Sequence, residues 1–104
     1  MSLNYGNMIK QAKIMQQKLL EIQKELKKME FEASAGGGAV KVKANGEQEV
    51  IEIKINKEMV DSNDMEMIED MVMVAVNDAI KQSRDEAKNK MAVLTGGMGI
   101  PGLF

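Results

Sequence analysis

A seven-residue repeat near the start of the chain is the feature that most constrains the fold. Apolar side chains occupy both seam positions of four successive heptads: Tyr5, Ala12, Leu19 and Leu26 at a, and Met8, Met15, Ile22 and Met29 at d. A heptad sustained this far is typical of a helix that packs along one narrow apolar seam. The repeat therefore predicts a helix over Tyr5–Glu30, about 39 Å long.

The middle of the chain carries the two-residue alternation of strands. Three segments alternate apolar with polar side chains and are separated by turn residues: Phe31–Ala35, Val40–Ala44 and Ile51–Ile55. This predicts an antiparallel meander with one wet face. A four-residue loop at 45–48 would place Val42 opposite Ile51, Val40 opposite Ile53 and Lys41 opposite Glu52. That register pairs apolar with apolar and opposite charges with each other.

A second helix is expected from about Asn63 or Asp64 to Leu94. Asn63 followed by Glu66 fits a capping box, and the Thr95–Gly97 segment would end the helix. Between Met71 and Ile80 the helix is apolar almost all the way round, so it should be buried on all sides. The fold class is thus α+β: a long N-terminal helix, a three-stranded antiparallel meander and a long C-terminal helix.

Element lengths argue for a homodimer. Strands of about 20 Å cannot cover helices of about 39 and 46 Å. A second copy would cover the seam and the all-round apolar stretch. We assign the dimer interface to apolar residues of the second helix and the third strand: Val72, Val76, Ala79, Ile80, Ile51 and Ile53.

Several function classes are disfavoured by the residue types present. The chain has no His and no Cys, so we expect no metal, no cofactor, no catalytic residue and no small-molecule substrate. Gly36–Gly38 lacks the Gly-Lys-Ser/Thr of a phosphate loop and is interpreted as a turn. Asp61–Asp64 resembles a calcium loop only faintly, because Glu66 stands where glycine is required. No apolar run approaches the roughly 20 residues that cross a bilayer, so the expected location is the cytoplasm.

Charge is segregated along a chain of net charge −2. Asn4–Glu30 holds six Lys and three Glu, whereas Glu58–Asp78 holds seven acids and no base. In the heptad frame Lys10, Lys13, Lys24 and Lys27 form a stripe opposite the seam, about 25 Å long. The stripe is either a solvated face, which the pattern alone favours, or an edge that follows phosphates. Few aromatic residues are present, which argues against base stacking and leaves duplex backbone as the nucleic-acid option.

Four blocks of sequence resemble the YbaB/EbfC family of bacterial nucleoid-associated proteins. They are Met8–Ala12 with Met15–Gln16, Gly37–Val42 with Asn45–Gly46, Met67–Met71 with Ala75–Ala79, and Lys90–Met91 with Thr95–Met98 and Pro101–Gly102. The resemblance spans essentially the whole chain, which indicates a single domain over 1–104. Met1–Leu3 looks like a cloning remnant, and 96–104 is a glycine-rich tail. Lys57 departs from the family, which often has Pro there.

The resemblance implies a cytoplasmic, nucleoid-associated homodimer that binds double-stranded DNA with little or modest sequence preference. In the family's fold, helical arms project from the dimer. Family DNA contact on the helices maps onto the lysines of the first helix and three bases of the second: Lys10, Lys13, Lys18, Lys24, Lys27 and Lys28, with Arg84, Lys88 and Lys90. The negative net charge keeps open a second class, a protein-interaction module whose helical arms grip a partner protein. The salt dependence of duplex binding would separate the two.

Overall fold

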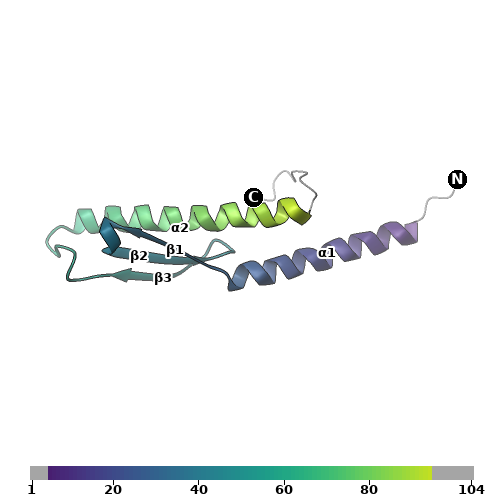
Figure 1. Cartoon of the computed structure of the whole chain (residues 1–104), viewed down its shortest axis with the longest axis horizontal. Coiled ribbons are helices and arrows are strands. Elements are labelled where there is room, and N and C mark those ends of the chain that lie inside the picture. The colour runs from purple at the N-terminus through teal and green to yellow at the C-terminus, as the bar shows by residue number, and fades with distance from the viewer. Residues whose placement is uncertain (1–4, 95–104) are drawn as a thin grey trace.

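Two long helices flank a three-stranded sheet in an elongated molecule measuring 75 × 22 × 16 Å (Figure 1). The computed structural model describes residues 5–94. Its elements are α1 (Tyr5–Lys28), β1 (Glu30–Ala35), the short 3-10 turn η1 (Gly36–Gly38), β2 (Val40–Asn45), β3 (Val50–Ile55) and α2 (Met65–Leu94). The strands are antiparallel in the order β1-β2-β3. The predicted fold class is confirmed, and α1 ends two residues earlier than expected.

The core lies between one face of the sheet and a stripe of small residues on α2. Ala75, Ala79, Ser83 and Ala87 recur every four residues and are all buried. With Ala33, Val40, Val42 and Ala44 of the strands, Ala75 and Ala79 make one apolar cluster. Small side chains at this spacing let the helix approach the sheet closely. The opposite face of the sheet carries its charged residues and stays wet.

The start of α2 differs from the predicted capping box. The Met67 N–H donates to Asp64 Oδ1 at 3.1 Å, so Asp64 is the N-cap. Asn63 instead belongs to the preceding turn, where its N–H donates to Asp61 Oδ1 at 2.9 Å. Asp suits the N-cap because its carboxylate also complements the positive end of the helix dipole. The predicted stop at Thr95–Gly97 lies outside the described residues.

The predicted register between β2 and β3 is wrong by two residues. Val42 lies opposite Ile53, Val40 opposite Ile55, and Lys41 opposite Lys54. Two features cause the shift. The turn closes on three residues, 46–48, because the Asn45 N–H bonds the Glu49 carbonyl at 2.9 Å. A bulge between Lys43 and Ala44 then adds one more residue on β3. A two-residue shift leaves each side chain on its predicted face.

A buried serine of α2 holds this turn. Ser83 Oγ donates to the Asn45 carbonyl at 2.7 Å and accepts from the Gln48 N–H at 3.1 Å. The Asn45 side chain adds two more bonds, since its Oδ1 accepts from the N–H groups of Glu47 and Glu49. Gln48 has a φ of 65°, a conformation stabilised here by these bonds. The turn geometry therefore depends on a residue 35 positions away in sequence.

The same turn anchors the C-terminal end of α1. Leu26 is the buried residue of that helix, and its carbonyl accepts hydrogen bonds from the N–H groups of Met29 and Gly46, the latter at 2.7 Å. The approach is so close that a Cβ at Gly46 would overlap the Leu26 carbonyl oxygen and lie 2.8 Å from its Cα. Only glycine allows this contact.

We expect Gly46→Ala to lower the free energy of unfolding by about 2–3 kcal/mol, because two backbones must separate to make room for the methyl group. Gly37→Ala is the matched control. Gly37 has a φ of 67° and open space around its Cα, so the strain of a left-handed residue alone should cost about 1 kcal/mol. Urea denaturation followed by circular dichroism measures both. Equal losses in the two variants would contradict the close approach at Gly46.

Candidate nucleic-acid interface

Most of α1 projects from the body of the molecule as a free-standing arm (Figure 1). Every residue from Tyr5 to Lys18 is exposed, and the helix becomes partly buried only from Leu19 onward. The predicted heptad seam is exposed as well, with Met8 at 61% and Met15 at 47%. A single chain therefore offers its arm to other molecules on all sides.

The arm carries its lysines on one side. At 100° per residue, Lys10, Lys13, Lys24, Lys27 and Lys28 fall within an arc of about 100°, whereas Lys18 lies outside it. All six are exposed. Within residues 5–94, none of the six takes part in an ion pair. Their ammonium groups are thus free to meet an anionic surface.

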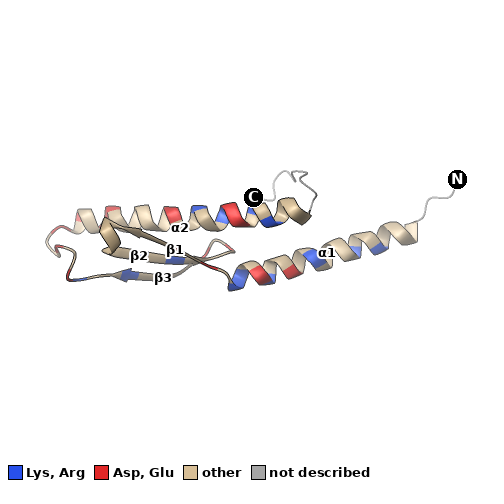
Figure 2. Cartoon of the chain, in the orientation of Figure 1, with Lys and Arg blue, Asp and Glu red and all other residues tan. Residues whose placement is uncertain are grey.

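Seven of the sixteen acidic residues lie just before α2 or in its first half, and two others, Glu21 and Glu25, lie on α1 itself. Glu58, Asp61 and Asp64 precede α2, and the acids of its first half follow, far from the projecting part of α1 (Figure 2). Exposed charges separated by more than about 8 Å are largely screened at physiological ionic strength. The local charge of the arm therefore matters more for a ligand there than the net charge of −2.

The three candidate bases of α2 have different surroundings. Arg84 and Lys88 are exposed, one turn apart. Lys90 is half-buried, and its Nζ lies 3.2 Å from Glu25 Oε2 of α1. Lys90 therefore ties α1 to α2 and has less charge to offer a ligand. Nearby, a hydrogen bond from Lys81 to Asp85 raises the pKa of the lysine and lowers the pKa of the carboxyl.

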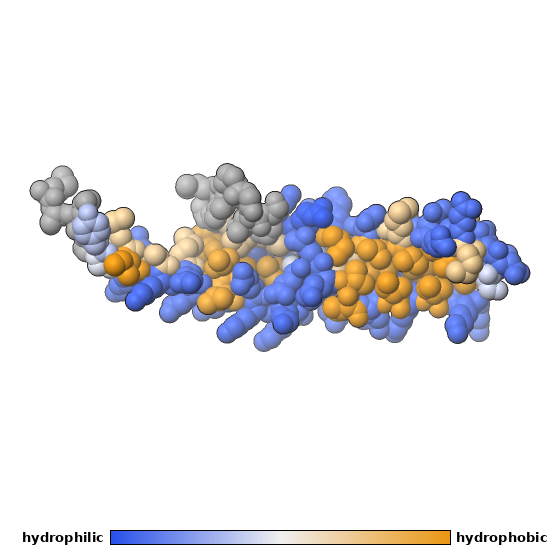
Figure 3. Space-filling model, turned by 180° about the vertical axis from the view of Figure 1, so that it is seen from behind, coloured by the Kyte–Doolittle hydropathy of each residue, from blue (hydrophilic) through white to orange (hydrophobic). Residues whose placement is uncertain are grey.

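The predicted interface residues form part of an apolar face over the sheet end of the molecule (Figure 3). Ile51 and Ile53 of β3 are 48% and 47% exposed. Val72, Val76 and Ile80 are half-buried at the edge of the core. Ala79 has no exposed surface, because it lies on the face of α2 that packs against the chain's own sheet. We call Ile51, Ile53, Val72, Val76 and Ile80 the β3–α2 apolar face.

The structure also places two bases together that the sequence reasoning did not combine. Lys41 and Lys54 are cross-strand partners on the wet face of the sheet. Only the correct register could have revealed this pair. Among the described residues no group of three or more His, Cys, Asp or Glu side chains is arranged to hold a metal ion. None of the helices within 5–94 is long and apolar enough to cross a membrane.

Comparison with known proteins decides the family. Residues 1–98 match the YbaB/EbfC DNA-binding family. The chain belongs to that family. A nucleoid-associated protein of Clostridium novyi is 48% identical over 98% of this chain and 90% of its own length. Another, from Thermoanaerobacter pseudethanolicus, is 48% identical over 97% of this chain and 91% of its own length.

The fold also agrees with a solved structure. The crystal structure of an uncharacterized protein from Helicobacter pylori superposes with a TM-score of 0.83, at 22% identity, over 91% of this chain and all of that chain. The superposition agrees with the fold, and the family match over residues 1–98 confirms the resemblance seen in the four sequence blocks. YbaB/EbfC proteins are a DNA-binding family and not an enzyme family, and the two bacterial relatives are named as nucleoid-associated proteins.

Proposed function

We propose that this protein binds double-stranded DNA as a homodimer, mainly through phosphate contacts, and acts as an architectural or regulatory component of the nucleoid. The observation that carries the proposal is the α1 arm. The helix is exposed on all sides from Tyr5 to Lys18. Along its whole length it bears five exposed lysines within one arc, and none of them has an ion pair within residues 5–94. Membership of a DNA-binding family supports the same ligand.

The type of cationic side chain on α1 favours contact with the DNA backbone over recognition of nucleobase edges. All six cations of α1 are lysines, and the chain has a single arginine, Arg84, on α2. An ammonium group is a point charge on a flexible stem, whereas bidentate recognition of guanine needs a planar guanidinium. Lysines spaced over about 25 Å would neutralise several phosphates and release their counterions. We therefore expect weak sequence preference and steep salt dependence.

A second copy of the chain would cover the apolar surface that one chain leaves exposed. Ile53 and Ile55 lie opposite Val42 and Val40, so they point toward the side of the sheet that α2 covers. Yet α2 packs across β1 and β2 and makes few contacts with β3. The isoleucines of β3 are consequently left 41–48% exposed. Burying them with the flank of α2 is the hydrophobic gain that would drive dimerisation.

The exposed seam of α1 supports the same conclusion. The seam residues that stay exposed in the single chain, among them Met8 and Met15, are expected to pack against a neighbouring helix. Dimerisation through the β3–α2 apolar face would leave two α1 arms on one particle. Two lysine stripes acting together bind DNA far more tightly than one, because the second contact is intramolecular.

Changing Lys10, Lys13, Lys24 and Lys27 together to Gln should weaken duplex binding about equally for unrelated sequences and make its salt dependence shallower. Each lost phosphate contact should lower the slope of log K against log salt by about 1. Fluorescence anisotropy titrations at several salt concentrations measure both effects. Circular dichroism should show an unchanged helix content, since Gln and Lys have similar helix propensities.

The control replaces three lysines outside the arm, Lys43, Lys57 and Lys81, by Gln, and should leave affinity within about twofold. If the arm variant binds duplex as well as the parent, the stripe is only a solvated face. The alternative function, a protein-interaction module that grips a partner through its helical arms, would then be favoured.

Ile53→Glu should convert the dimer to a folded monomer at micromolar concentration, because the charge would be buried unpaired in the interface. Ile53 is 47% exposed in the single chain, so the chain's own core should tolerate the change. Val93→Glu is the matched control at an apolar position that is 84% exposed and outside the β3–α2 apolar face. Sedimentation equilibrium checks the masses. A dimeric Ile53→Glu variant would show that this face is not the interface.

A further inference from the structure

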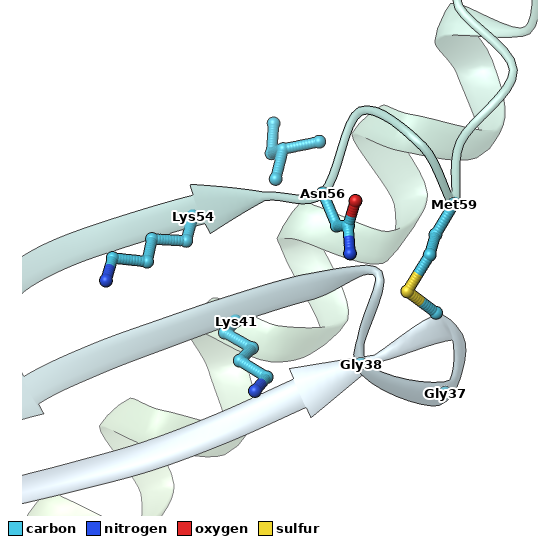
Figure 4. Close-up of a pocket in the computed structure, with 7 residues that line it drawn as sticks. Gly37, Gly38, Lys41, Lys54, Asn56 and Met59 are labelled. Carbon is cyan, nitrogen blue, oxygen red and sulfur yellow. The ribbon is translucent and has the colours of Figure 1, made fainter.

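A hollow of about 490 Å³ lies beside the glycine turn η1 (Gly36–Gly38), where β2 begins and β3 ends (Figure 4). It is separate from the α1 arm, and it belongs to the region that carries Lys41 and Lys54. Its lining consists of Gly37, Gly38, Lys41, Lys54, Ile55, Asn56 and Met59.

Two lysines occupy neighbouring positions on this part of the sheet. Lys41 and Lys54 are direct cross-strand partners, an arrangement that destabilises a sheet unless the charge is neutralised. Glu52 lies 3.6 Å from Lys54 but shares its carboxylate with Lys43, also at 3.6 Å. Lys41 has no ion pair with any residue in 5–94. Lys43 has an acid on both neighbouring strands, Glu32 and Glu52, whereas the cross-strand partners of Lys41 are Ser34 and Lys54. The excess positive charge is therefore local to the Lys41–Lys54 pair.

Asn56, the third polar side chain that lines the hollow, presents a hydrogen-bond donor. Asn56 Oδ1 accepts a hydrogen bond from the Glu58 N–H at 3.0 Å, which assigns the other end of the amide as Nδ2. Figure 4 shows that nitrogen pointing into the hollow toward the glycine turn. The main chain of Asn56 is fixed at both ends, with its N–H bonded to the Ala39 carbonyl and its carbonyl bonded to the Met59 N–H. The donor is therefore positioned before any ligand arrives.

Glycine keeps the far wall of the hollow open. Gly37 and Gly38 have φ values of 67° and 98°, and a Cβ at Gly37 would meet nothing within 4 Å. A ligand can therefore approach the main chain there without a side chain in the way. The Lys41 stem passes close by, 3.8 Å from where a Cβ of Gly38 would lie.

We propose that this hollow binds a phosphate group. The ammonium group of Lys41 and the amide N–H₂ of Asn56 point toward the glycine end of the hollow, and the ammonium group of Lys54, which pairs with Glu52, lies on the neighbouring strand. These donors match the acceptor oxygens of a phosphate. Ile55 and Met59 add an apolar wall against which the organic part of a phosphate ester can pack. A free nucleotide and the DNA backbone both supply this chemistry. The site does not use the α1 lysines, so it goes beyond the proposed DNA contact.

The test is a ¹H–¹⁵N NMR titration of the full chain with three probes: inorganic phosphate, adenosine 5′-monophosphate and a 20-base-pair duplex. We expect saturable shifts at the amides of Gly37 and Gly38 and at the Asn56 side chain. The Lys41→Gln/Lys54→Gln variant should bind at least tenfold more weakly. It should also unfold at no lower temperature, because it removes a repulsive pair.

Two further variants sharpen the test. Asn56→Asp keeps the acceptor for the Glu58 N–H but replaces the donor by a negative charge, so it should abolish the shifts without opening the turn. Lys57→Gln removes one exposed lysine that does not line the hollow, and it should bind like the parent.

Shifts from the duplex alone would identify the DNA backbone as the phosphate source, and shifts from phosphate or the mononucleotide would identify a free ligand. Either result supports the site. The variant with Gln at Lys10, Lys13, Lys24 and Lys27 should keep its response to inorganic phosphate, so failure of the α1 contact and failure of this site are distinguishable. The proposal is overturned if no probe gives saturable shifts, or if the Lys41→Gln/Lys54→Gln variant responds as the parent does.

Discussion

The close packing of α2 on β1 and β2 is the contact on which the rest of the molecule depends. A stripe of Ala and Ser every four residues brings the helix axis near the sheet, and Ser83 reaches the β2–β3 turn from it. The β2–β3 turn then holds Gly46 against Leu26 at the end of α1. One helix face therefore determines the core, the strand register and the anchor of the arm. Because α2 packs over β1 and β2 and not over the middle of the whole sheet, it leaves β3 largely uncovered, and a partner could pack there.

Local periodicity was enough to predict the elements. The heptad repeat, the alternation in three segments and the apolar stripe of α2 each lie within one continuous stretch, so the sequence alone locates them to within about two residues. The register could not be predicted in the same way. It depends on the three-residue turn that Ser83 holds and on a bulge beside Ala44, and neither is encoded in the two strands themselves. The helix cap was displaced for a related reason, since Asp61 draws Asn63 into a separate turn.

The candidate sites also differ in whether neighbouring residues in the sequence were enough to predict them. Exposure of the α1 lysines follows from the heptad frame, because residues opposite an apolar seam face water. The pairing of Lys90 with Glu25 joins residues 65 positions apart and has no local signal. The Lys41–Lys54 pair was hidden by the register error, which had set Lys41 opposite the acid Glu52. Both lysines of this repulsive pair line the hollow.

The anchoring of α1 at its last turn makes the helix a lever. Leu26 is held by Gly46, while Tyr5 stands about 31 Å away along the axis. A rotation of about 10° at the anchor would move the tip by about 5 Å, which exceeds the roughly 3.4 Å rise between successive phosphates of one DNA strand. Small changes around one glycine would thus be amplified into a different phosphate register at the far end. How widely the two arms of a dimer stand apart would be decided at the β2–β3 turn, which contacts the last turn of α1 beside Lys27.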